Sequence, residues 1–192
     1  MPPSSLFLDY AARLTQSISM ADWSGVSKLS DMLDRARRER RQVFLCGNGG
    51  SAANAIHWAN DLTAALFKGT RDALRTHALP ANIAVMSCLA NDLSYEVAFS
   101  QQLRVLGEPG DLLIVLSGSG NSPNILSALR EAKVLGIQSV AVLGFDGGAA
   151  LALADHPVHF PVHDMQIVED LQLVVGHMLM RQLAAMNTPA TI

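Results

Sequence analysis

Four ionisable side chains at helical spacing are the first candidates for chemistry in this sequence. His57 and Asp61 are four residues apart, and Glu169 and His177 are eight residues apart. At 3.6 residues per turn, each pair falls on roughly one side of a helix. Two imidazoles and two carboxylates form a ligand set suited to Zn²⁺ or another divalent ion. The pattern therefore predicts a metal site, provided that the fold brings the two helices together.

Each pair also has a simpler structural explanation. A His–Asp pair at this spacing is often an ordinary surface pair on a helix. A single histidine in an apolar helix is often a hydrogen-bonded core residue. The segment that carries Glu169 and His177 is mostly Ile, Val and Leu. Burying an acid in such a segment is costly unless the acid is paired or binds a metal.

A turn rich in glycine and serine follows the apolar run at residues 111–115, and it reads LSGSGNSPN over residues 116–124. The run predicts a buried strand, and residues 125–135 have the apolar spacing of a helix. Glycines let a ligand approach the backbone, and a helix N-terminus favours an anion. With the hydroxyls of Ser117, Ser119 and Ser122, the turn predicts a phosphate site, although an ordinary capped loop would look similar. The G-x-x-x-x-G-K-[ST] pattern is absent, which favours a small sugar phosphate over ATP.

A second turn of this kind, GNGGSAA at residues 47–53, follows the predicted strand at residues 42–46. Ligands of parallel sheets bind at the carboxyl ends of the strands. We therefore expect the two turns to meet in one crevice.

Strands and helices alternate along the chain, which predicts a three-layer α/β/α sandwich with a parallel sheet of five or six strands. We expect one domain, with N-terminal helices at residues 1–41, an α/β core and a C-terminal helix at 42–186, and a tail at 187–192. Residues 69–80 read as a loop, and residues 95–106 as a helix. The predicted strands are 42–46, 83–87, 111–116, 139–143 and the proline-flanked edge strand 158–162.

Composition limits the classes of function. The chain has 192 residues, a net charge of −3, 49% hydrophobic and 16% charged residues. These values are typical of a globular domain with one core. The charge argues against a nucleic-acid surface. No signal peptide or apolar run of about 18 residues is recognisable, and neither cysteine has a partner at metal-binding spacing. We expect a cytoplasmic protein with free thiols and no membrane contact.

Four short motifs together resemble the successive signatures of the sugar isomerase (SIS) domain family. They are GNGGSAA at 47–53, AND at 90–92, SGSGNSPN at 117–124 and GFDGG at 144–148. Within the family, the chain resembles the phosphoheptose isomerases, which convert sedoheptulose 7-phosphate to D-glycero-D-manno-heptose 7-phosphate. The resemblance covers residues 6–183.

The resemblance implies a homotetramer with active sites at subunit interfaces and one Zn²⁺ in each site. The positions it assigns to the metal are His57, Asp61, Glu169 and His177. The positions it assigns to substrate and phosphate are Asn48, Gly49, Ser51, Asn91, Asp92, Ser117, Ser119, Asn121 and Ser122.

Two of these positions depart from the usual family pattern, because Asp61 stands where glutamate is common and Glu169 where glutamine is common. Aldose–ketose isomerisation moves a proton between adjacent carbons through an enediol, which requires a base, an acid and stabilisation of the oxyanion. We hypothesise that Asp61 or Glu169 is the base that removes the carbon-bound proton. His177 would act on the carbonyl and hydroxyl oxygens of the substrate.

Other functions are compatible with the same fold. A non-catalytic SIS protein, such as the relative that associates with a replication initiator, would lack the acid and histidine positions. A sugar-phosphate-sensing regulator would carry a DNA-binding domain. An isomerase of another ketose phosphate would keep all the features described above.

Overall fold

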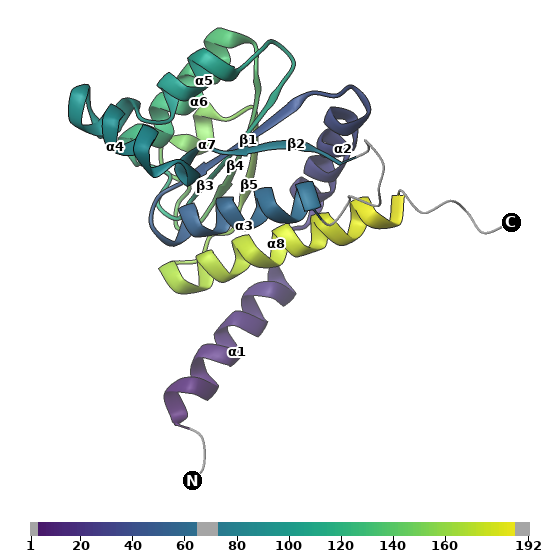
Figure 1. Ribbon diagram of the computed structural model, residues 1–192. Helices are drawn as coiled ribbons and strands as arrows, with labels where there is room; N and C mark the ends of the chain where they lie inside the picture. Colours follow the sequence, from purple (N-terminus) through teal and green to yellow (C-terminus); the bar gives the residue numbers. More distant parts are fainter. Residues whose placement is uncertain (1–3, 65–72, 187–192) are drawn as a thin grey trace, which may run out of the picture.

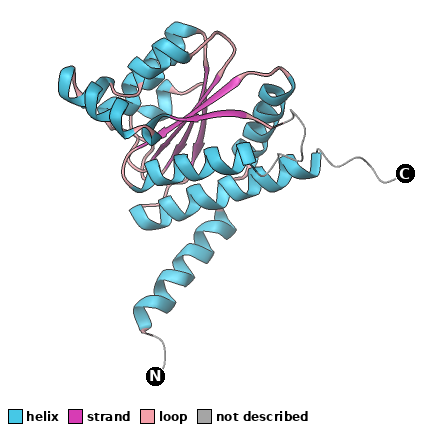
Figure 2. Cartoon of the chain, in the orientation of Figure 1, coloured by secondary structure: helices cyan, strands magenta, loops and turns pink. Residues whose placement is uncertain are grey.

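A parallel β-sheet of five strands lies at the centre of the protein (Figures 1 and 2). The computed structural model describes residues 4–64 and 73–186. The strand order is β2-β1-β3-β4-β5, with all pairs parallel. The strands are β1 (Gln42–Gly47), β2 (Arg75–Ala78), β3 (Leu112–Ser117), β4 (Gln138–Leu143) and β5 (His156–His159).

The helices cover both faces of the sheet. They are α1 (Ser5–Met20), α2 (Ser24–Arg38), α3 (Gly50–Ala64), α4 (Ile83–Asp92), α5 (Ser100–Leu106), α6 (Pro123–Leu135), α7 (Ala150–Leu153) and α8 (Met165–Met186), with short 3₁₀ turns at Leu79–Ala81 and Tyr95–Val97. Along β3, Ile114 packs with α2, α3 and α8, whereas Leu113 and Val115 pack with α4 to α7. This alternation follows from the period of two along a strand. The predicted three-layer sandwich is confirmed.

The strand predicted at residues 83–87 is wrong, because this segment begins helix α4. An apolar run this short does not distinguish a strand from a buried helix. Asn82 decides the outcome, because its side-chain oxygen accepts a hydrogen bond from the amide of Val85 at 3.2 Å. This contact caps the helix. An asparagine directly before an apolar run is the sequence signal that could have indicated the start of a helix here.

The strand that the sequence did not reveal is β2, which lies in the stretch predicted as a loop at 69–80. The structure describes residues 73–80 of that stretch. Strand β2 is four residues long, lies at the sheet edge and has no fully buried residue. It therefore lacks the apolar run by which buried strands are recognised.

Two other boundaries differ from the prediction. The edge strand predicted at 158–162 is β5, which begins two residues earlier and has Pro157 inside it. An edge strand tolerates proline because one side of it needs no hydrogen-bond donor. The helix predicted at 95–106 is divided into a 3₁₀ turn and α5.

Helix α1 projects away from the sandwich (Figure 1) and has no buried residue. Its attachment to the body includes two polar contacts with the start of α8. The Tyr10 hydroxyl donates to Asp170 Oδ2 at 2.6 Å, and Arg13 Nη1 donates to Asp164 Oδ2 at 2.8 Å. None of the described helices is long and apolar enough to span a membrane.

Candidate functional site

The two glycine-rich turns meet at one hollow of about 250 Å³. Strands β1 and β3 are neighbours, and Gly47 pairs with Leu116 at their carboxyl ends. Strand β1 has β2 on one side and β3 on the other, so this is the switch point of the sheet. The hollow is lined by Asn48, Gly49, Gly50, Ser51, Leu116, Ser117, Gly118, Ser119, Ser122, Met165 and Glu169.

Local hydrogen bonds fix the serine turn. Ser117 Oγ accepts from the amide of Gly120 at 3.1 Å, and Ser119 Oγ accepts from the amide of Asn121 at 3.3 Å. Gly120 has φ +65°, a value that favours glycine. Ser122 is the N-cap residue of α6. The positive dipole end of that helix therefore lies at the hollow, a feature that suits an anion.

Glu169 is the acidic residue at this hollow. Its carboxylate lies against Gly50, where an added Cβ atom would overlap Oε2. Glu169 therefore lies beside the start of α3, and a side chain at position 50 would displace its carboxylate. A carboxylate thus lies next to the serine hydroxyls.

His57, Asp61 and His177 form a second group, and their candidate ligand atoms all lie within 4.8 Å of one another. His57 Nε2 is 3.1 Å from His177 Nε2 and 3.3 Å from Asp61 Oδ2, and His177 Nε2 is 3.9 Å from the same oxygen. Two nitrogens bound to a tetrahedral zinc ion at about 2.1 Å lie about 3.4 Å apart. The spacing of these donor atoms therefore fits a zinc ion.

The structure groups three of the four residues predicted for the metal, and Glu169 belongs to the hollow instead. Helices α3 and α8 run side by side, with Gly50 near Glu169 and His57 near His177. The two groups are separated by about 10 Å along α3 and about 12 Å along α8, at a rise of 1.5 Å per residue.

A buried polar layer joins α3 to α8 between these groups. Asn54 Nδ2 donates to the carbonyl of Glu169 at 2.9 Å and to Gln172 Oε1 at 3.0 Å, and Trp58 Nε1 donates to the carbonyl of Gln172 at 3.0 Å. Gln172 Nε2 is buried with no hydrogen-bond partner among the described residues. Asn54 and Trp58 were not among the predicted site residues, because their partner lies on a helix more than 100 positions away.

Asn48 joins the two turns through its side chain. Its amide forms a reciprocal pair with the amide of Asn124, with N···O distances of 2.9 and 2.8 Å. Tyr95 donates its hydroxyl proton to Asn48 Oδ1 at 2.8 Å. Asn124 and Tyr95 were not among the predicted site residues.

Three predicted substrate-binding residues do not line the hollow. Asn91 and Asp92 end helix α4, where Asn91 donates to Asp92 at 2.8 Å. This hydrogen bond and one from Cys88 hold the pKa of Asp92 below its ordinary value. The side-chain oxygen of Asn121 accepts from the amide of Ala149 at 2.9 Å, so it ties the serine turn to the GFDGG loop.

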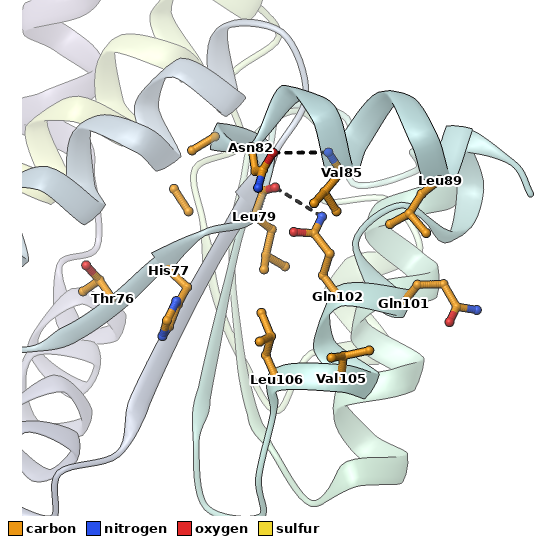
Figure 3. A pocket seen from close by; sticks show the side chains of 12 residues that line it. Thr76, His77, Leu79, Asn82, Val85, Leu89, Gln101, Gln102, Val105 and Leu106 are labelled. Atoms are coloured by element: carbon orange, nitrogen blue, oxygen red, sulfur yellow. Dashed lines mark hydrogen bonds between the residues drawn. The ribbon is translucent and has the colours of Figure 1, made fainter. Parts of the chain in front are cut away.

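A larger hollow of about 680 Å³ lies elsewhere, beside β2, α4 and α5 (Figure 3). Val85, Leu89, Val105 and Leu106 line it, together with His77. Burial lowers the pKa of His77, with a further contribution from Arg75. Both effects favour the neutral imidazole. Among its described lining residues, this hollow contains no cluster of acids or hydroxyls suited to catalysis.

Comparison with known proteins decides the family. The sequence model of the SIS domain matches residues 6–144. Phosphoheptose isomerase of Chlorobaculum parvum is 37% identical over 179 residues, which cover 92% of this chain and 86% of that protein. The chain belongs to the SIS domain family, among its phosphoheptose isomerases.

A second relative agrees with this family assignment, and a solved structure agrees with the fold. Phosphoheptose isomerase of Clostridium acetobutylicum is 36% identical over 80% of this chain and 78% of that protein. The solved phosphoheptose isomerase of Francisella tularensis superposes with a TM-score of 0.86 at 23% identity, covering 95% of this chain and 100% of that one. Family and fold therefore agree with the resemblance seen in the motifs.

Proposed function

We propose that this protein interconverts sedoheptulose 7-phosphate and D-glycero-D-manno-heptose 7-phosphate. The observation that carries the proposal is the pairing of two sites along one pair of helices. One is the serine-rich hollow at the start of α3 and α8, and the other is the group of His57, Asp61 and His177 about two turns further on. Membership among enzymes supports this function over a non-catalytic binding role.

The distance between the two groups suits a seven-carbon sugar phosphate. Three bonds of an extended chain span about 3.5 Å, so the eight bonds from C1 to phosphorus span about 9 Å. The two groups are separated by about 10 to 12 Å along the helices. With the phosphate on Ser51, Ser117, Ser119 and Ser122, C1 and C2 would approach the histidines.

This orientation favours Asp61 as the base over Glu169. The proton that moves belongs to C1 and C2, at the opposite end of the sugar from the phosphate. Asp61 lies beside both imidazoles, whereas Glu169 lies among the serines. Asp61 would take the carbon-bound proton on the carboxylate oxygen that is not a candidate metal ligand, and His177 would orient the oxygens between which a proton moves. Glu169 would accept hydrogen bonds from hydroxyls nearer the phosphate.

His57, Asp61 and His177 would hold a zinc ion, for which their donor atoms are suitably spaced. When bound, the ion would supply electrophilic polarisation of the sugar carbonyl and hydroxyl. The imidazole nitrogens and the carboxylate would also keep the reacting end of the sugar oriented.

The test is an NMR assay of purified protein with sedoheptulose 7-phosphate, before and after chelation and after return of Zn²⁺. We expect turnover that chelation removes and zinc restores. Turnover that is unaffected by chelation would argue against the metal. Turnover only of another ketose phosphate would keep the reaction class but change the substrate.

We also propose a homotetramer with active sites at subunit interfaces, located in the cytoplasm. Leu6, Phe7 and Leu8 of α1 are exposed, and the hollow of Figure 3 is apolar. Both surfaces would suit contact with further copies of the chain. The free thiols of Cys46 and Cys88 are consistent with a reducing compartment. Light scattering would measure the mass of the assembly.

A further inference from the structure

Three side chains from three separate segments meet beside the serine-rich hollow. Asn48 follows β1, Asn124 lies in the first turn of α6, and Tyr95 begins the 3₁₀ turn after α4. Asn124 is 2% exposed, Asn48 is partly buried, and Tyr95 is 52% exposed. We call these three residues the Asn48 clamp.

A backbone contact determines how the amides are oriented. The amide N–H of Ile125 donates to Asn124 Oδ1 at 3.0 Å. Only the oxygen of a side-chain amide can accept such a bond, so this contact identifies the Asn124 oxygen. The reciprocal pair then requires the Asn48 oxygen to face Asn124 Nδ2. Tyr95 donates to the same Asn48 oxygen.

The consequence for Asn48 follows from counting its donors and acceptors. A carbonyl oxygen accepts through two lone pairs, and both are used by Asn124 and Tyr95. One N–H of Nδ2 is used by Asn124, which leaves one N–H for a ligand. Asn48 can therefore offer a phosphate a single N–H, held in the direction that the other two residues set.

We propose that Asn124 and Tyr95 are positioning residues that hold the two phosphate turns at a fixed spacing through Asn48. The inference rests on the proposed function, since it takes the hollow as the phosphate site. Asn124 connects the turn after β3 to the turn after β1, and Tyr95 connects the segment after α4 to Asn48 in the turn after β1. A reciprocal pair with Asn124 buried and Asn48 partly buried suits this role, because unpairing either amide leaves polar groups without partners.

The test compares wild type with Asn124→Ala, Tyr95→Phe and the double variant. Inorganic phosphate is titrated while the amide NMR signals of Gly49 and Gly118 are followed, and KM and kcat are measured for sedoheptulose 7-phosphate. We expect Asn124→Ala to raise the phosphate Kd and KM about tenfold while kcat changes about threefold or less. Tyr95→Phe should raise both about twofold to threefold. Because both residues act on Asn48, the fold-change in phosphate Kd of the double variant should be smaller than the product of the two single fold-changes.

The control is Asp155→Ala at the amino end of the sheet. Asp155 Oδ2 accepts from the amide and hydroxyl of Ser139 at 2.9 and 2.8 Å, so this variant loses partly buried hydrogen bonds far from the hollow. We expect it to lower Tm without changing the phosphate Kd. If Asn124→Ala lowers Tm but keeps the wild-type phosphate Kd, its role is structural and the proposal is overturned. Phosphate binding by wild type without turnover would reject the isomerase, and the same comparison of phosphate Kd values would still decide the role of the clamp.

Discussion

Asp61 and Glu169 show how placement distinguishes two carboxylates that look alike in the sequence. Both were candidates for the base, because both are carboxylates at positions that the family resemblance assigns to the site. Asp61 Oδ2 lies 3.3 Å from His57 Nε2. The carboxylate of Glu169 lies against Gly50, about two turns away along α3. The two side chains should therefore contribute to different kinetic parameters.

We expect Asp61→Asn to lower kcat about 10²-fold to 10⁴-fold, the range for loss of a general base. Glu169→Gln should change mainly KM, because it keeps a hydrogen-bonding group of the same shape and loses only the charge. Steady-state kinetics with sedoheptulose 7-phosphate measures both. If Glu169→Gln lowers kcat more than Asp61→Asn does, Glu169 is the base and the proposed roles of the two residues are reversed.

At the scale of elements, the site depends on the close approach of α3 and α8. Gly176 on α8 faces Trp58 on α3, and a Cβ added at position 176 would overlap Trp58 Nε1. Trp58 is 1% exposed and donates a hydrogen bond to the carbonyl of Gln172, so it has little freedom to move. The approach brings His57 to His177 and Gly50 to Glu169.

Gly176→Ala should destabilise the protein although alanine favours helices. Overpacking costs about 1–3 kcal/mol, against about 1 kcal/mol gained in helix propensity. We expect a Tm several degrees lower, at roughly 2–4 °C per kcal/mol for a chain of this size. Calorimetry of this variant and of Gly176→Ala/Trp58→Phe checks the cause, since the smaller ring should recover part of the loss. An unchanged Tm in the single variant would show that the two helices separate at little cost.

At the scale of the whole molecule, the contact of α1 with the body depends on protonation. The hydrogen bond to Asp170, then burial and the charge of Asp170, raise the pKa of Tyr10 to about 12. A phenol with a raised pKa in the folded state stabilises that state fully below its ordinary value of about 10. This contribution disappears as pH rises from about 10 to about 12, because the detached tyrosine ionises first.

The measurement is a pH titration of tyrosinate absorbance in a Tyr95→Phe background, which leaves Tyr10 as the only tyrosine. We expect a midpoint near 12. Asp170→Asn should lower it toward about 10, and Asp9→Asn on α1 serves as the control that leaves it unchanged. A Tyr10 midpoint that Asp170→Asn does not move would mean that α1 is not attached through this hydrogen bond.

The sequence by itself determined the features that depend on neighbours along the chain. The apolar run of β3, the glycines and serines after it and the spacing of His57 and Asp61 all act locally. They therefore predicted the layered fold, the meeting of the two glycine-rich turns and one side of the ionisable group. Local signals failed where a short segment was ambiguous, as in the Asn-capped start of α4, or where an edge strand had no apolar run, as in β2.

Only the tertiary structure decided which distant residues meet. It separated Glu169 from His57, Asp61 and His177, because the packing of α8 along α3 places Glu169 beside Gly50 and His177 beside His57, about two turns apart. It also paired Asn48 with Asn124, 76 positions away. Spacing along a chain fixes the face of a helix, but which helices touch, and at which turn, depends on packing between segments far apart in sequence.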